Sequence, residues 1–267
     1  VWQVADLGMC DGGLITITAT ISTGLTEEVI IPNTASIISA IDEVNLANNS
    51  STVEIEVNLP PQVTASPDQS GVEGQALELT LAGFADPGLD DTHTATVDWG
   101  DGLVESALVD QETDLVSGSH TYTDNGMYQV AVTVTDSDGG VGNDSFQITV
   151  ANASPQVIAE GDRELEEGTA FSGTLAIYSD LGAEDTHTAQ IDWGDGTLEA
   201  GLIDPGLATV SGQHTYGDNG DYSVVITVTD DDGGIGADGL LMKVANLAPE
   251  VTPGDDVRAA VNDPTAF

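Results

Sequence analysis

The chain has 267 residues, of which 40% are hydrophobic, enough to build packed cores in two or three domains. Its 46 Asp and Glu residues face only 3 Lys and Arg residues, which gives a formal net charge of −43. This charge repels phosphate backbones and anionic membrane surfaces, so it excludes nucleic acid as a partner and favours bound cations. The single cysteine, Cys10, allows no internal disulfide, and no apolar run is long enough for membrane insertion.

The first part of the chain carries short β-branched runs, namely LITITAT, EEVIIPNTASIIS and STVEIEVNL. Residues of this type with frequent turns between them are typical of strands. These runs share no landmark with the rest of the sequence. We therefore predict that residues 1–59 are the C-terminal part of a separate immunoglobulin-like β-sandwich.

The remainder of the chain repeats with a step of 94 residues. DTHTATVDWGDG, which contains Trp99, returns as DTHTAQIDWGDG, which contains Trp193, and HTYTDNGMYQVAVTVTDSDGG returns as HTYGDNGDYSVVITVTDDDGG. No gap is needed between these landmarks. The repeat predicts one β-sandwich at 60–151, a second at 152–245, and the start of a truncated third repeat at 246–267. The joining segments NLPP, NASP and NLAP are short and contain proline, which favours semi-rigid junctions.

Within each repeat, hydrophobic residues alternate with polar ones at a period of two. Tyr128, Val130, Val132 and Val134 show the pattern most clearly, and Gly-rich turns such as DNG and DGG separate the runs. A period of two indicates strands with one buried face, and no helical pattern of useful length occurs. The predicted fold class is all-β, as tandem immunoglobulin-like antiparallel β-sandwiches.

The motif set DWGDG, HTYTDNGMYQVAVTVTD and DGG, in this order, resembles the PKD domain, an immunoglobulin-like module of extracellular proteins. The segment NTASIISAIDEVNLANNSSTVEIEV resembles the end of an acidic immunoglobulin-like repeat of bacterial surface-layer and adhesin proteins. The resemblance implies a non-enzymatic module. PKD modules occur in surface proteins and as accessory domains of secreted proteases and polysaccharide-degrading enzymes.

Three interpretations of the DWGDG motif are open: a catalytic acid pair, a metal site, or the end of a strand. Trp99 and Trp193 are in phase with inward residues, which favours a place in the core over an exposed platform for sugars or peptides. A strand-end turn offers no cleft for a glycosidase acid pair. His120 and His214 precede tyrosines that resemble a tyrosine corner, which favours structural hydrogen bonding over a Ser-His nucleophile. We expect no catalytic residues and no zinc site.

Calcium is the serious metal candidate, because Ca²⁺ binds six to eight hard oxygens from flexible loops. Sandwich topology places the domain entry, the first long loop and the DSDGG loop at one pole, next to the preceding module. By resemblance, some PKD modules of secreted collagenases bind calcium in this region, although Gly88 and Gly182 replace an aspartate that is usual there. The alternative is that these acids only keep a secreted protein soluble. The predicted ligands are Asn58, Asp86, Asp90, Asp91, Asp136 and Asp138 in the first repeat, and Asn152, Asp180, Glu184, Asp185, Asp230 and Asp232 in the second.

These observations favour a non-enzymatic extracellular or cell-surface array, in which tandem immunoglobulin-like modules act as a calcium-rigidified spacer in a structural or adhesive protein. The alternative is a set of accessory modules that bind polysaccharide or protein for a large secreted hydrolase. Expected partners are neighbouring modules of the same chain and an extracellular protein or carbohydrate, without nucleic acid and without membrane insertion of this segment.

Overall fold

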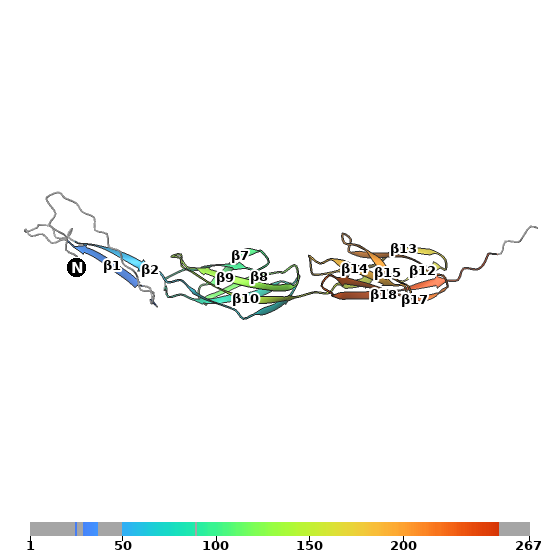
Figure 1. Cartoon of the computed structure of the whole chain (residues 1–267), viewed down its shortest axis with the longest axis horizontal. Coiled ribbons are helices and arrows are strands. Elements are labelled where there is room, and N and C mark those ends of the chain that lie inside the picture. The colour runs from blue at the N-terminus through green and yellow to red at the C-terminus, as the bar shows by residue number, and fades with distance from the viewer. Residues whose placement is uncertain (1–24, 26–28, 37–49, 89, 251–267) are drawn as a thin grey trace, which may run out of the picture.

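The structure is a computed structural model that describes residues 25, 29–36, 50–88 and 90–250, and every regular element in these ranges is a β-strand (Figure 1). The predicted all-β sandwich fold is confirmed. The expected strand LITITAT and most of the truncated third repeat lie outside the described residues.

The N-terminal part is described as a two-stranded antiparallel pair. Strand β1 (Val29–Ser36) pairs with β2 (Ser50–Val57), and almost all of their side chains are exposed. The rest of the sandwich predicted for residues 1–59 lies outside the described residues, so that prediction stays open.

Two eight-stranded modules follow, and we call them module 1 and module 2. Module 1 consists of β3 (Gln62–Ala65), β4 (Gln69–Val72), β5 (Leu77–Ala85), β6 (Thr94–Asp98), β7 (Val104–Asp110), β8 (Leu115–His120), β9 (Gly126–Thr135) and β10 (Val141–Ala151). Module 2 consists of β11 (Gln156–Ala159), β12 (Arg163–Glu166), β13 (Ala170–Ser179), β14 (His187–Asp192), β15 (Leu198–Asp204), β16 (Thr209–Thr215), β17 (Gly220–Asp230) and β18 (Ile235–Ala245).

Both modules have the same strand order, β3-β5-β8-β7-β6-β9-β10-β4 in module 1 and β11-β13-β16-β15-β14-β17-β18-β12 in module 2. In module 1, β3, β5 and β8 form one layer, and β6, β9, β10 and β4 form the other. Strand β7 joins the layers on one side, because its first half pairs with β6 and its second half with β8. The entry segment joins them on the other side, because β3 pairs with β5 and β4 pairs with β10.

One strand pair in each module departs from a purely antiparallel pattern. Strand β4 runs parallel to β10, and β12 runs parallel to β18. The entry segment crosses from one layer to the other without reversing, so its second half runs in the direction of the last strand. Each module thereby closes most of its sheet edges, which limits edge-to-edge pairing with other chains.

The core lies between the two layers of each module. The alternation predicted along β9 is confirmed, since Val130, Val132 and Val134 are fully buried. On β5 the alternation breaks, because a bulge between Thr80 and Ala82 places the adjacent residues Leu81 and Ala82 both inside. A bulge adds one residue to a strand and shifts the face that its neighbours present.

Modules 1 and 2 lie end to end and touch directly (Figure 1). The backbone carbonyl of Thr123 in module 1 accepts hydrogen bonds from the N–H groups of Ala183 (3.0 Å) and Glu184 (3.4 Å) in module 2. Gly74, in the turn after β4, approaches Leu181 so closely that a Cβ atom there would collide with the Leu181 carbonyl oxygen. The junction is therefore a contact surface with its own geometry.

The close approach at Gly74 predicts a specific effect of Gly74→Ala. Gly74 has a φ of +67°, and its counterpart Gly168 has a φ of +75° but has open space where a Cβ atom would lie. Both alanine variants carry the cost of a left-handed backbone, about 1–2 kcal/mol. We expect only Gly74→Ala to open the junction as well, seen by small-angle scattering as a changed inter-module distance distribution. If Gly74→Ala and Gly168→Ala gave the same distance distribution, the close contact between Gly74 and Leu181 would be contradicted.

Candidate functional site

The two DWGDG motifs end strands β6 and β14 and belong to the core. Trp99 and Trp193 are 1% and 0% exposed, which confirms the core interpretation and leaves no exposed tryptophan within the described part of the chain. The Tyr122 hydroxyl donates to the Trp99 carbonyl over 3.0 Å, and Tyr216 donates to Trp193 over 2.9 Å. The tyrosine is thus tied back to the backbone, as predicted, and in module 1 it fastens the DWGDG turn to the segment between β8 and β9.

The histidines beside these tyrosines also have structural partners. His120 Nε2 lies 2.7 Å from Asp101 Oδ2, and its ring stacks on the Trp99 indole at a centroid distance of 4.7 Å. The Ser119 hydroxyl donates a hydrogen bond to Glu78 rather than to a histidine, so Ser119 and His120 do not form a nucleophile–base pair. Burial opposes ionisation of Asp101, but hydrogen bonds from the Leu103 N–H and from His120 outweigh it and lower the pKa of Asp101.

Removing the Tyr122 hydroxyl tests this anchor. Tyr122→Phe leaves the buried Trp99 carbonyl without its donor, which we expect to cost about 1–3 kcal/mol of unfolding free energy. Tyr128→Phe is the matched control, because the Tyr128 hydroxyl bonds the more exposed carbonyl of Asp124, which can bond water instead. Chemical denaturation would measure both. A loss for Tyr122→Phe no larger than for Tyr128→Phe would contradict the anchor.

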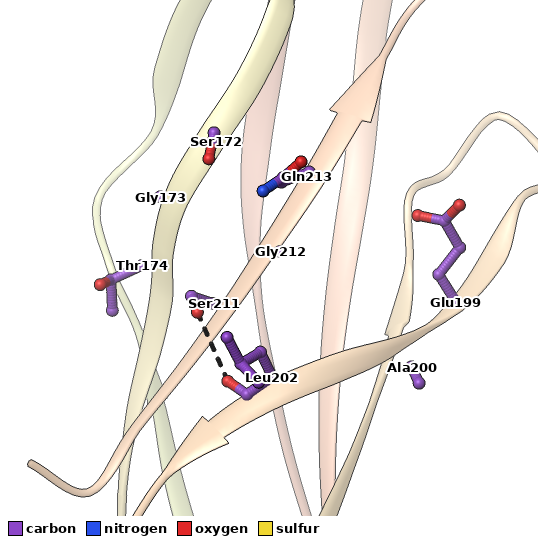
Figure 2. Close-up of a pocket in the computed structure, with 9 residues that line it drawn as sticks. All are labelled: Ser172, Gly173, Thr174, Glu199, Ala200, Leu202, Ser211, Gly212 and Gln213. Atoms are coloured by element: carbon purple, nitrogen blue, oxygen red, sulfur yellow. Dashed lines mark hydrogen bonds between the residues drawn. The ribbon is translucent and has the colours of Figure 1, made fainter.

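Shallow concavities on the outer face of each module offer no catalytic constellation. In module 2 one is lined by residues of β13, β15 and β16 (Figure 2). Its one ionisable side chain is Glu199, whose Oε2 accepts a hydrogen bond from the Trp193 indole over 2.9 Å. Ser211 donates to the Leu202 carbonyl over 3.5 Å. The concavity therefore presents neither an acid pair nor a nucleophile with a base.

The pole of module 1 next to its entry gathers part of the predicted calcium set. Carboxylate oxygens of Asp86, Asp91 and Asp136 lie within 4.8 Å of one another. Asn58, at the entry, donates its amide N–H to both oxygens of Asp136 over 3.0 and 3.1 Å. Asn58 Oδ1 and Asp91 Oδ2 are buried and have no hydrogen-bond partner. Unpartnered buried oxygens beside a carboxylate cluster are suited to a hard cation.

Local turns hold these carboxylates in place. Asp136 accepts backbone N–H bonds from Asp138 (2.9 Å) and Gly140 (2.8 Å) within the DSDGG turn. Burial opposes ionisation of Asp136, but the bonds from Asn58 and from this turn outweigh it and lower the pKa of Asp136. Asp86 bonds to His93 Nε2 over 2.9 Å, which fixes the orientation of its carboxylate.

The remaining predicted ligands of module 1 lie apart from this cluster. Asp90 and Asp138 are exposed, and neither has a carboxylate in the group formed by Asp86, Asp91 and Asp136. Asp138 contributes its backbone N–H to the turn rather than its carboxylate. The structure thus brings together four of the six residues predicted for this repeat.

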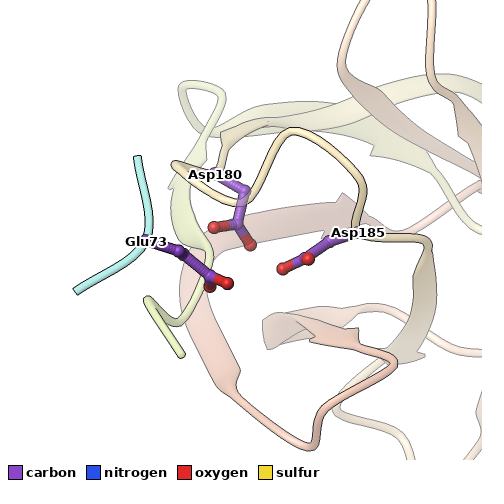
Figure 3. Close-up of side chains that lie close together, drawn as sticks. All are labelled: Glu73, Asp180 and Asp185. Carbon is purple, nitrogen blue, oxygen red and sulfur yellow. The ribbon is translucent and has the colours of Figure 1, made fainter. Parts of the chain in front are cut away.

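Module 2 repeats part of the arrangement at its own entry, which is the junction with module 1, but Asp230, the counterpart of Asp136, is not in the carboxylate group there. Asn152 donates to both oxygens of Asp230 over 3.1 Å. Asp180 and Asp185 come together as their counterparts do in module 1, here with Glu73 of module 1 (Figure 3). Glu184 is exposed and contacts module 1 through its backbone N–H.

Two acids at this junction were not among the predicted ligands. Glu73 and Asp124 belong to module 1, yet Glu73 lies within 4.8 Å of Asp180 and Asp185, and Asp124 lies within the same distance of Asp185 and the predicted ligand Asp232. A signal existed, because a step of 94 residues carries Glu73 to Glu167. It was not decisive, since a glutamate before a turn glycine is common on a protein surface.

Crowding shifts the ionisation of the junction acids. Burial, followed by repulsion from Asp180 and Asp124, raises the pKa of Glu73. Burial, followed by repulsion from Glu73 and Asp180, raises the pKa of Asp185 to about 6. Both carboxylates are therefore destabilised in their charged form when no cation is bound.

A carboxyl with a higher pKa in the folded than in the unfolded protein takes up a proton on folding, so stability rises as the pH falls between the two values. For Asp185 that window runs from about 6 down to its ordinary value of 3.8. In chelator we expect the melting temperature of the protein to rise between pH 7 and pH 5, and to rise less in Asp185→Asn. Acids whose pKa is lowered by folding, such as Asp101, lose their stabilising contribution only below their ordinary pKa of 3.8, outside this window. If the melting temperature of Asp185→Asn changed with pH as that of the unmodified chain does, the role of Asp185 would be contradicted.

Comparison with known proteins identifies both repeats. A family model described as the PKD domain matches residues 58–150 and 152–243, which is more than half of the chain. The comparison with curated protein sequences gave no significant match. The segment before residue 58 is not covered by the family match, so its resemblance to surface-layer and adhesin repeats stays a prediction.

Solved structures that resemble the chain include tandem β-sandwich proteins and a PKD domain. Fibronectin(III)-like modules of CbhA from Clostridium thermocellum are 15% identical, with a TM-score of 0.31, over 72% of this chain and all of theirs. Mouse cadherin-23 EC22–24 is 18% identical, with a TM-score of 0.32, over 76% of this chain and 72% of that one. The PKD domain of an M14-like peptidase from Thermoplasmatales archaeon SCGC AB-540-F20 is 25% identical, with a TM-score of 0.28, over 35% of this chain and 98% of that one.

These TM-scores lie below 0.5, so the resemblances carry no argument about function. In the part of the chain that the structure describes, no helix is long and apolar enough to cross a membrane.

Proposed function

The chain belongs to the PKD domain family through its two repeats, and we propose that it is a non-enzymatic spacer in an extracellular or cell-surface protein. The observation that carries this proposal is the direct contact between modules. Backbone hydrogen bonds from Ala183 and Glu184 to Thr123 set module 2 against the end of module 1. A fixed end-to-end contact suits a part that holds other domains at a distance.

The interior of the modules supports a structural role. The residues with catalytic potential in the repeated motifs have structural partners: Asp101 bonds His120, Ser119 bonds Glu78, and the Trp99 indole is buried. A buried indole cannot serve as a platform for sugar rings, which weakens the alternative of a polysaccharide-binding accessory module.

We further propose that calcium ions at the module entries stiffen the array. In module 1 the ion would be held by Asp86, Asp91 and Asp136, with the Asn58 carbonyl oxygen completing the protein ligands. The fit rests on the buried, unpartnered Asn58 Oδ1 and Asp91 Oδ2 beside the carboxylate cluster. A bound divalent ion neutralises charges that otherwise repel one another at the end of the module.

Small-angle scattering of the full 267-residue chain in CaCl₂ and in EDTA tests the spacer proposal. We expect a longer, narrower distribution of distances and a higher melting temperature in calcium, because ligand binding to the folded state alone stabilises it. Unchanged scattering and melting would reject a calcium-stiffened spacer. Retention on insoluble chitin, cellulose or collagen would instead favour the accessory binding role.

A further inference from the structure

Glu73 is the most deeply buried acid in the described part of the chain, with 0% of its surface exposed. Its Oε1 accepts a hydrogen bond from the Ala153 N–H over 2.7 Å, whereas its Oε2 has no hydrogen-bond partner. An ionised carboxylate in this position is costly unless a positive charge compensates it. The structure thus contains a buried acceptor that the fold of module 1 does not explain.

The unpartnered oxygen of Glu73 belongs to a carboxylate group that crosses the junction. The side chain of Glu73 points toward Asp180 and Asp185, which come from the loop between β13 and β14 of module 2 (Figure 3). One oxygen from each of the three lies within 4.8 Å of the others. Asp185 Oδ2 is also buried without a partner. Each module therefore contributes to this group a carboxylate that carries an unpartnered buried oxygen.

Asp124 extends this group from the module 1 side. It lies in the turn between β8 and β9, and its carboxylate is within 4.8 Å of Asp185 and Asp232. Asp185 belongs to both groups and links them. Among the described residues, the basic partner that the structure gives to this set is His187, whose Nε2 lies 2.9 Å from Asp180 Oδ2, and Arg163 engages Glu160 instead. In this part of the chain, no Lys or Arg pairs with Glu73, Asp124 or Asp185.

We propose that a divalent cation binds between the modules, with Glu73 of module 1 and Asp180 and Asp185 of module 2 as its carboxylate ligands. Calcium fits this donor set best. Ca²⁺ takes six to eight oxygen ligands in flexible geometry, whereas Mg²⁺ demands near-ideal octahedral geometry and usually keeps several waters. Asp124 and Asp232 stand beside this site and supply further oxygens, directly or through water.

This site would make the junction itself a cation-dependent joint. Its ligands come from both modules, so the ion binds tightly only when the modules hold the relative placement seen in the structure. Without the ion, the same carboxylates repel one another across a contact held by a few backbone hydrogen bonds. The role of the joint in stiffening rests on the proposed spacer function, but cation binding by Glu73 does not depend on it.

Glu167 provides a matched control for Glu73. It stands 94 residues later, and its Oε1 accepts a hydrogen bond from the Leu247 N–H over 2.9 Å, as Glu73 does from Ala153. Among the described residues, Glu167 belongs to no group of metal-ligating side chains, whereas Glu73 does. Glu167→Gln thus removes a corresponding charge and backbone contact, at a partly exposed position, without facing carboxylates.

Calorimetric titration of the chelator-stripped 267-residue chain with CaCl₂ tests the proposal. We expect Glu73→Gln to lose one calcium site or weaken it by about tenfold or more, and Glu167→Gln to match the unmodified chain. Melting adds a second readout. In EDTA, Glu73→Gln should melt at or above the unmodified chain, because glutamine keeps the acceptor for Ala153 and removes a repelled charge. In calcium, Glu73→Gln should have a lower melting temperature than the unmodified chain.

Three outcomes overturn the proposal: equal calcium binding by Glu73→Gln and the unmodified chain, equal losses in Glu73→Gln and Glu167→Gln, or a lower melting temperature for Glu73→Gln in EDTA as well as in calcium. The last would mark Glu73 as a structural residue. If calcium lengthens the unmodified chain and Glu73→Gln alike, the spacer function stands and this junction site falls.

Discussion

Carboxylates outnumber Lys and Arg by 46 to 3, and the structure depends on how their charge is compensated. In the turns, hydrogen bonds from backbone N–H groups compensate much of the carboxylate charge. Asp98, Asp101 and Asp110 each accept a hydrogen bond from the residue two positions later. These bonds compensate the charge of the acid and also set the turn, as aspartate side chains commonly do. Where modules 1 and 2 meet, the carboxylates of Glu73, Asp180 and Asp185 lie close to one another.

The repeated aromatic and histidine residues play a structural part in the same scheme. Asp101 sets the turn after β6 through Leu103 and also holds His120, which stacks on Trp99. The Tyr122 hydroxyl then closes the unit by bonding the Trp99 carbonyl. Residues whose types suggest catalysis are thus satisfied by one another, and the motif ends a strand and caps the core at one pole of the module.

The two poles of a module have different chemistry, and tandem repetition brings unlike poles together. The pole with the entry carries the aspartates of two loops, and the opposite pole carries DWGDG, Glu73 and Asp124. At the junction, Glu73 bonds Ala153 of the connecting segment and lies against Asp180 and Asp185. In the tandem arrangement Glu73 is buried, and residues of the next module complete its carboxylate group.

The sequence by itself determined the module. A period of two and a 94-residue step were sufficient for the all-β sandwich fold and the buried Trp99, because both follow from strand alternation within one repeat. The order of loops placed Asp86, Asp91 and Asp136 at one pole, but it did not separate them from Asp90 and Asp138, which the structure leaves outside their group. Strand β7 joining both layers and the parallel β4–β10 pair depend on packing between layers. Only the tertiary structure decided the role of Glu73, since its facing carboxylates lie more than a hundred residues away. The contact of Thr123 with Ala183 and the close approach of Gly74 to Leu181 fix how the two modules meet. Neither contact can be recognised from a local sequence pattern.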